Sequence, residues 1–189
     1  ARRTPGEIRI IGGKWRGRKI TVIETELLRP TPDRARETLF NWLQPYLPGA
    51  RCLDLFAGTG ALGFEAASRG AGQVIMIERD GRLINQLREQ ILLFGANNIT
   101  AEQSESLAWL QATKKSFDIV FLDPPFGQGL IPGCCDLLVK QGCLHKGGMV
   151  YVESERPAPQ PAGWSIKKQT TAGQVQCMLL ASESAGCLS

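Results

Sequence analysis

The chain has 189 residues, which is long enough to bury a hydrophobic core without a metal or a disulfide to hold it. It is 43% hydrophobic and 21% charged, as in an ordinary globular protein. No apolar run approaches the roughly 20 residues that cross a bilayer. The first residues are not followed by the apolar segment of a secretory signal, so we expect a cytoplasmic protein without a membrane partner.

Basic residues concentrate near the N-terminal end. Residues 1–36 contain ten Lys or Arg against four Asp or Glu, whereas the remainder contains twelve against fourteen. A basic segment on a slightly acidic body is typical of an arm that contacts nucleic-acid phosphates. A solvated basic face is the alternative.

The six cysteines and the single histidine, His145, do not indicate a metal centre. No CxxC pair is present, and several cysteines lie in apolar stretches, where a reduced cysteine packs as a small hydrophobic residue. With one histidine, catalytic triads and two-histidine metal motifs are hard to build. We therefore expect no metal.

Residues 1–48 are predicted to form a basic extension made of a β-hairpin and a helix. Two β-prone runs within 8–23 flank a glycine-rich centre. The residues predicted near the bend, and to contact RNA, are Lys14, Trp15, Arg16 and Arg18.

A helix is predicted after this hairpin. Thr31 can cap it, and Pro32 suits its first position. Its apolar side consists of Leu39, Phe40, Trp42 and Leu43, and the prolines at 45 and 48 are expected to end it.

From residue 49 onward, strand-like and helix-like segments alternate, which indicates a doubly wound, mostly parallel α/β sheet. Strands are predicted at 51–55, 73–78, 99–103, 117–122 and 148–153. Helices are predicted at 61–69, 82–94, 104–111 and 130–140. The segments 164–171 and 175–182 differ and predict a C-terminal antiparallel hairpin.

A glycine-rich loop follows the first strand of this sheet. Gly58 and Gly60 allow a tight turn and the close approach of a ligand to the backbone. Together with Gly63 they match the dinucleotide fingerprint, so a nicotinamide dehydrogenase is a competing interpretation. However, Asp54 at the strand end would repel a pyrophosphate and suits the ammonium group of S-adenosylmethionine. Glu78 ends the next strand, where a carboxylate can bind both ribose hydroxyls.

The fourth strand ends in Asp123-Pro124-Pro125-Phe126, which suits the activation of an aromatic amine. The lone pair of such an amine is delocalised into the ring, and two acceptors beside its N–H bonds can make it available. Asp123 and the Pro124 carbonyl would be these acceptors, held rigidly by consecutive prolines. Phe126 offers a face on which a base can stack.

The whole pattern resembles the RsmD-type 16S ribosomal RNA guanine-N2 methyltransferases, a family of class I S-adenosylmethionine-dependent enzymes with a Rossmann-like sheet. The resemblance rests on residues 9–17, on 28–34 with 36–42, on 54–60 and on 123–126. It implies methyl transfer from S-adenosylmethionine to the 2-amino group of one guanine in 16S rRNA, within the small subunit or an assembly intermediate. A monomer is expected.

The family's motifs also assign residues by position. The resemblance implies that the methionine end of the cofactor is held by Asp54, Phe56, Gly58, Thr59 and Gly60, and the ribose by Glu78. The adenine contact would fall at Glu105, followed by Ser106 and Leu107. Thr31 and Arg34 are expected to border the pocket, with Arg34 also near the RNA.

Four alternatives remain open at this stage. A DNA adenine-N6 methyltransferase also uses Asp-Pro-Pro-aromatic motifs, and a dehydrogenase would leave that motif without a role. A non-catalytic RNA-binding module would retain RNA but transfer no methyl group. Cys134 and Cys135 could suggest a cytosine-C5 nucleophile, but they fall within a predicted helix, where packing is the simpler explanation.

Overall fold

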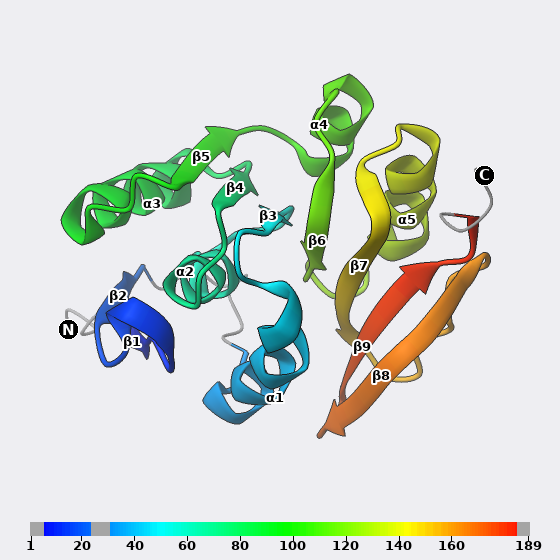
Figure 1. Cartoon of the computed structure of the whole chain (residues 1–189), viewed down its shortest axis with the longest axis horizontal. Coiled ribbons are helices and arrows are strands. Elements are labelled where there is room, and N and C mark those ends of the chain that lie inside the picture. The colour runs from blue at the N-terminus through cyan, green and yellow to red at the C-terminus, as the bar shows by residue number, and fades with distance from the viewer. Residues whose placement is uncertain (1–5, 24–30, 185–189) are drawn as a thin grey trace.

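The computed structural model describes residues 6–23 and 31–184 and forms an α/β fold around a seven-stranded sheet (Figure 1). The strand order is β5-β4-β3-β6-β7-β9-β8. The strands are β3 (Arg51–Asp54), β4 (Gln73–Glu78), β5 (Ile99–Gln103), β6 (Phe117–Leu122), β7 (Leu144–Glu155), β8 (Trp164–Ala172) and β9 (Val175–Ser182). The helices are α1 (Asp33–Leu43), α2 (Ala61–Ser68), α3 (Gly81–Phe94), α4 (Ser106–Ala112) and α5 (Leu130–Lys140).

The predicted Rossmann-like sheet is confirmed. Strands β3 to β7 are parallel, whereas β9 pairs antiparallel with both β7 and β8. The chain winds from β3 outward through β4 to β5 and then returns to the other side of β3 as β6. The carboxyl ends of β3 and β6 therefore flank the point where the winding reverses, which is where ligands bind in open α/β sheets.

Most element bounds agree with the sequence-based prediction, with one larger difference. Strand β7 begins at Leu144, whereas residue 148 was predicted. The additional stretch, 144–147, ends in Gly147 next to Gly148 and was therefore not recognised as a strand. A register shift between Phe117 and Ile119 in the pairing of β6 with β7 accommodates it.

The helices cover both faces of the sheet and form two hydrophobic cores. Helices α1, α2 and α3 cover one face, where Phe40, Phe64 and Leu87 pack against strand residues such as Phe121. Helices α4 and α5 cover the other, where Leu110 and Leu138 belong to the core. Both faces of the strands are buried, as expected for a parallel sheet.

The N-terminal residues form the predicted hairpin and helix. Strands β1 (Gly6–Arg9) and β2 (Lys19–Val22) pair antiparallel, and the 3₁₀ turn η1 (Gly13–Trp15) lies between them. Gly13 lies in the left-handed region with φ 77°, and a Cβ there would come within 1.9 Å of the Ser68 carbonyl oxygen. The hairpin bend therefore lies directly against the end of α2.

The predicted start of α1 is wrong by one position. Pro32 occupies the N-cap, and no side chain caps the helix. Thr31 points elsewhere, because its hydroxyl is bound to Glu153 at the end of β7. A second short turn, η2 (Gln44–Tyr46), follows α1.

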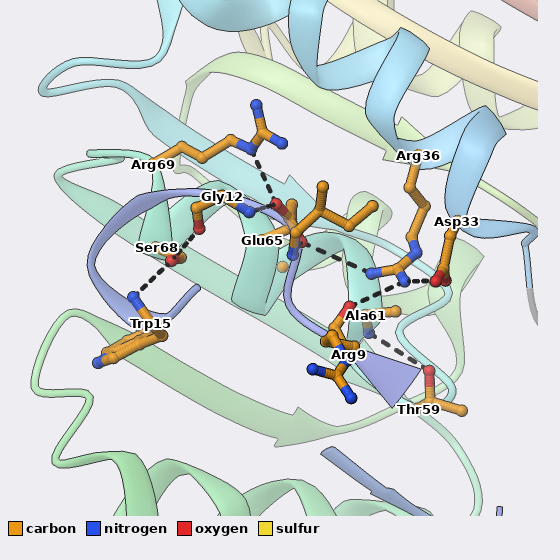
Figure 2. A network of polar contacts seen from close by, with 12 residues as sticks. Arg9, Gly12, Trp15, Asp33, Arg36, Thr59, Ala61, Glu65, Ser68 and Arg69 are labelled. Carbon is orange, nitrogen blue, oxygen red and sulfur yellow. Dashed lines mark hydrogen bonds and ion pairs between the residues drawn. The ribbon is translucent and has the colours of Figure 1, made fainter. Parts of the chain in front are cut away.

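Glu65 on α2 binds the N-terminal segment to the sheet (Figure 2). Its side chain is fully buried and accepts hydrogen bonds from the backbone N–H groups of Ile11 and Gly12 at 2.9 and 2.8 Å. It also accepts one from Arg69 at 2.8 Å and lies 3.6 Å from the fully buried guanidinium of Arg36 on α1. A buried carboxylate needs such partners, because desolvation disfavours its charge.

The hairpin and α1 share one hydrophobic core with the sheet. Ile10, Ile20 and Phe40 belong to the same buried cluster as Cys52 and Val74 of strands β3 and β4. The division into units 1–48 and 49–189 stays a prediction.

Among the residues that the structure describes, no helix is long and apolar enough to cross a membrane.

Replacement of Glu65 by alanine should lower the free energy of unfolding by about 3–5 kcal/mol, because it leaves buried Arg36 with only the exposed Asp33 carboxylate as a partner and removes the acceptor of the Ile11 and Gly12 N–H groups. Urea unfolding measures this change. The control is Glu7→Ala, which removes an exposed carboxylate paired with Lys19 and should cost no more than about 1 kcal/mol. Equal losses in the two variants would contradict the role given to Glu65.

Candidate functional site

The glycine loop lies at the carboxyl end of β3 and leads directly into α2. Backbone hydrogen bonds join Leu55 to Phe121 on β6 and Ala57 to Ile77 on β4, so the loop is fixed between its neighbouring strands. Gly60 has φ 81° and caps α2, and a Cβ there would come within 2.6 Å of Leu87. Only glycine fits this position without displacing the packing of α3.

Asp54 is buried beneath this loop, with 1% of its surface exposed. One carboxylate oxygen accepts a hydrogen bond from the Gly63 N–H at 3.2 Å, and the other oxygen is buried without a hydrogen-bond partner. Burial raises the pKa of Asp54 to about 7, although the Gly63 and Phe56 N–H groups lower it and nearby Glu78 raises it further. A buried acceptor without a partner is the feature expected where a cationic ligand group binds.

Glu78 at the end of β4 lies against the same loop. One of its oxygens accepts a hydrogen bond from the Gly58 N–H at 2.9 Å, and the other accepts one from the Asp80 N–H at 2.9 Å. Each carboxylate oxygen has two lone pairs, so both can still accept from a ligand. Thr59 accepts a hydrogen bond from the Ala61 N–H at 3.3 Å and so supports the start of α2.

Asp123, Pro124, Pro125 and Phe126 leave the end of β6, next to β3 in the sheet. The three residues after Asp123 border a cavity of about 220 Å³ between the start of α5 and the loop after β7. Pro157 and Ala158 of that loop, together with Leu130 and Ile131, make most of its wall apolar. Such a wall suits a flat aromatic ligand.

Three further residues, Thr31, Tyr151 and Glu153, lie close to Asp123. The sequence did not identify them as a group. Leu122 pairs with Val152, so Asp123 and Glu153 are the next residues of neighbouring strands. The Thr31 hydroxyl donates to the two Glu153 oxygens at 3.2 and 3.1 Å, and it lowers the raised pKa of nearby Asp123. The Tyr151 hydroxyl donates to Glu153 at 3.0 Å. No sequence pattern predicts the contact of Thr31 with Glu153, because it joins segments 122 residues apart.

These acidic groups influence one another strongly. Burial raises the pKa of Asp123 well above its usual value, and the charges of Glu153 and Asp54 raise it further. Burial also raises the pKa of Glu153, although the Tyr151 and Thr31 hydroxyls lower it. Among residues 6–23 and 31–184, no group of three or more His, Cys, Asp or Glu side chains could hold a metal ion.

The residues predicted near the adenine lie at the start of α4. Glu105 caps this helix and accepts a hydrogen bond from the Ala108 N–H at 3.0 Å. Ser106 donates to the Leu55 carbonyl at 2.7 Å, which brings the start of α4 against the end of β3. Leu107 is partly buried against the core on that face. The capping contact gives Glu105 a structural role, and its contact with adenine stays a prediction.

The predicted RNA-contacting side chains divide into surface and core residues. Lys14, Arg16, Arg18 and Arg34 are exposed. Trp15 is only 7% exposed, and its ring packs edge-on against Phe64 and Phe94 at 6.3 and 5.2 Å. The prediction that Trp15 contacts RNA is therefore corrected, because its ring is a core residue that anchors the hairpin to α2 and α3.

A second cleft, of about 380 Å³, lies between the hairpin bend and the end of α2. Lys14 and Arg69 give it positive charge, and Gln44 and Asn98 add amide groups. The amino ends of β3 and β4 are near it, so it lies away from the glycine loop along the strands. It does not belong to the crevice around Asp123.

Among the described residues, His145 and the cysteines Cys134 and Cys135 lie outside this crevice, whereas Cys177 lies near it. Cys134 and Cys135 are fully buried on α5, and burial raises the pKa of each thiol to about 12, which confirms packing rather than nucleophilic reactivity. Cys177 on β9 borders Tyr151. His145 joins Ser116 and Asp118 in one hydrogen-bonded chain at 2.6 and 2.8 Å, a triad-like arrangement that the sequence analysis considered hard to build. These residues lie at the opposite, amino end of β6 and β7.

A glycine loop and an Asp-Pro-Pro-Phe segment at the reversal point of a Rossmann-like sheet define a methyltransferase. Comparisons with known proteins agree. Residues 8–181 match the family model described as "Conserved hypothetical protein 95". Ribosomal RNA small subunit methyltransferase D of Escherichia coli (strain K12) is 45% identical over 184 residues, which covers 96% of this chain and 93% of that protein.

Two further relatives support the same assignment. The Haemophilus influenzae protein of the same name is 44% identical over 92% of this chain and 93% of its own. The solved structure of the Escherichia coli protein yhhF superposes with a TM-score of 0.85 and 46% identity, covering 94% of this chain and 99% of that one. The chain belongs to the RsmD family, which includes the ribosomal RNA small subunit methyltransferases D.

The corrected position of Trp15 can be tested by mutation. Trp15→Ala should lower the free energy of unfolding by about 3–5 kcal/mol, because it removes a large core side chain. Lys14→Ala, at the exposed neighbour, should change it by no more than about 0.5 kcal/mol. Urea unfolding of both variants is the measurement. If Trp15→Ala left stability unchanged and weakened only RNA binding, the ring would instead act at the RNA surface.

Proposed function

We propose that this protein transfers the methyl group of S-adenosylmethionine to the exocyclic N2 amine of a guanine in the 16S RNA of the small ribosomal subunit. The observation that carries the proposal is that two acidic side chains, Asp54 and Asp123, lie in one crevice. Asp54 suits a cationic group, and Asp123 suits an N–H donor. Asp54 offers a buried, unpartnered oxygen beneath the glycine loop, and Asp123 lies close enough for the charge of Asp54 to raise its pKa. The names of the family's members support the RNA substrate.

The residues around the glycine loop fit S-adenosylmethionine. Asp54 would accept hydrogen bonds from its ammonium group, and the Glu78 carboxylate would accept from the ribose hydroxyls. The left-handed turn at Gly60 lets the backbone approach the ligand closely. The cofactor supplies a methyl group already activated by a sulfonium, so the protein contributes mainly position.

The Asp123 segment would hold the guanine. The Asp123 carboxylate and the Pro124 carbonyl would accept hydrogen bonds from the two N2–H bonds and present the nitrogen lone pair to the methyl group. The apolar cavity beside Pro125 and Phe126 would take the ring, which must leave its stack to reach Asp123. A loop nucleotide is the easier substrate for this reason.

The exposed basic residues would bind the RNA backbone. Lys14, Arg16 and Arg18 lie on the hairpin, and Lys14 also lines the cleft beside the end of α2. Arg18 also stacks over Phe94 at 3.8 Å and donates to the Leu93 carbonyl, so its guanidinium is held in place. Phosphate contacts of this kind orient an RNA without selecting its sequence.

Methyl transfer tests the proposal directly. The purified protein should transfer a labelled methyl group from S-adenosylmethionine to small-subunit RNA or its assembled particle, and nucleoside mass spectrometry should show N2-methylguanosine. Asp123→Ala should lower the rate at least about tenfold, because one of the two acceptors is lost. Asp136→Ala, at an exposed position of α5, is the control and should change it little. N6-methyladenosine as the product would contradict the proposed base, and retention of RNA without methyl transfer would contradict the proposed activity.

The raised pKa of Asp54 predicts a pH dependence of cofactor binding. The free carboxyl takes up a proton as the pH falls through about 7, and only the ionised form attracts an ammonium group. The dissociation constant for S-adenosylmethionine should therefore rise about tenfold for each pH unit well below 7. Isothermal titration calorimetry between pH 5.5 and 8 measures it.

Two variants make this test specific. Asp54→Asn should bind weakly and lose the pH dependence, since the amide cannot ionise. Asp80→Asn is the matched control, because Arg82 holds the pKa of Asp80 at about 2, well outside this range. An affinity that stayed constant from pH 5.5 to 8 in the unmodified protein would show that Asp54 does not bind the cation.

A further inference from the structure

Ser154 has a buried hydroxyl without a hydrogen-bond partner beside the cavity proposed for the base. The residue lies near the end of β7, and 9% of its surface is exposed. Its hydroxyl oxygen makes no hydrogen bond to any residue that the structure describes. A buried hydroxyl without a partner is unfavourable for folding, so such a group indicates that a ligand or a water molecule completes it.

The strand directs this hydroxyl toward the cavity. Successive side chains of a strand point to opposite faces, so Ser154 shares a face with Val152, two residues earlier. Val152 belongs to the core beneath α4 and α5, and Ser154 lines the cavity at the start of α5 together with Met178 of β9. Glu153 also borders the cavity, but its carboxylate accepts a hydrogen bond from Tyr151, which belongs to the core of the other face.

The polar side chains of the cavity differ in what they can offer a ligand. Most of the lining is apolar or proline, and the polar side chains are three consecutive residues, Glu153, Ser154 and Glu155. An ionised carboxylate only accepts hydrogen bonds, whereas a hydroxyl can donate one. Among the described side chains that line the cavity, Ser154 therefore has the only hydroxyl that can donate to an acceptor atom of a base.

The register of the strands places this donor opposite the carbonyl proposed to hold the amine. Leu122 pairs with Val152, so two residues further along Pro124 and Ser154 are level with each other. Neighbouring strands lie about 4.8 Å apart, which is comparable with the separation of N2 and O6 across a guanine ring. A guanine whose amine contacts Asp123 and the Pro124 carbonyl would thus bring its O6 acceptor to the Ser154 hydroxyl.

We propose that Ser154 is a specificity-determining residue whose hydroxyl donates a hydrogen bond to O6 of the guanine and so selects guanine over adenine. This inference rests on the proposed function and deepens it by naming a contact to the base. Adenine has no carbonyl oxygen, so an adenine with its amine at Asp123 would leave the hydroxyl unpaired. A site built to hydrogen-bond a substrate group discriminates against an analogue that lacks it, because the buried protein group then has no partner.

A base analogue tests this contact in the unmodified protein. 2-Aminopurine keeps the 2-amino group of guanine but lacks O6 and the N1 proton. In small-subunit RNA with 2-aminopurine in place of the methylated guanine, kcat/KM for methyl transfer should fall at least about tenfold. Equal rates with the two bases would overturn the inference.

Variants of Ser154 assign this loss to the hydroxyl. Ser154→Ala should lower kcat/KM for the guanine RNA at least about fivefold. It should change the slow reaction with 2-aminopurine by no more than about twofold, because that base has no oxygen for the hydroxyl to bind. Ser154→Thr keeps the hydroxyl and should retain guanine methylation within about threefold. Equal losses with the two bases in Ser154→Ala would overturn the inference.

Two controls separate base recognition from a structural role. Ser165→Ala removes a β8 hydroxyl that donates to the Ala181 carbonyl at 3.4 Å, and it should leave both rates unchanged. Because the Ser154 hydroxyl has no partner in the folded chain, Ser154→Ala should leave the midpoint of urea unfolding unchanged or raise it. A lowered midpoint would give this hydroxyl a structural role and contradict the inference.

The inference and the proposed function fail in different ways. If the unmodified protein transfers no methyl group to guanine, the proposed function is wrong and the role of Ser154 fails with it. If Ser154→Ala methylates guanine at the full rate, the proposed function stands and only the selection by Ser154 is overturned.

Discussion

The site depends on one electrostatic constraint: Asp54, Asp123 and Glu153 share a crevice with little access to solvent. Their proximity follows from the topology, because β3, β6 and β7 are neighbouring parallel strands that end at the same edge of the sheet. Buried like charges cannot all remain ionised without cations or protons. The crevice is therefore suited to a cationic ligand group on one side and an N–H donor on the other.

The N-terminal segment is part of this site rather than an attachment to it. Thr31 lies just before the N-cap of α1 and donates to Glu153 at the end of β7. Arg36, one turn into α1, is buried against Glu65 of α2, the helix that starts at the glycine loop. The hairpin is held by the same Glu65 through its backbone N–H groups. One buried carboxylate thus sets the positions of the basic surface and of Thr31 relative to the sheet.

Most of the fold could be predicted from the sequence, because each element contains its own local pattern. The bounds of β4, β5, β6 and α5 agree with the predicted ranges, since apolar runs and glycine or proline breaks define them. The start of α1 was misplaced because Thr31 has the local chemistry of a cap but a stronger tertiary partner in Glu153. The early start of β7 was missed because glycine has low strand propensity and pairing with β6 outweighs it.

The site was predictable only where its chemistry lies in a contiguous motif. Asp54 and Asp123 stand at strand ends next to glycines and prolines, and parallel topology brings such ends together. Trp15 shows the opposite case: among basic neighbours an aromatic residue suggests base stacking, yet its ring fills the space between α2 and α3. Composition cannot distinguish these two uses, because both place an aromatic ring on a basic hairpin. Glu153 was equally hidden, since its part in the site arises from its burial and from a hydroxyl 122 residues away. The motifs thus identify which groups would touch the ligands, whereas the protonation of those groups is decided by contacts that only the folded chain makes.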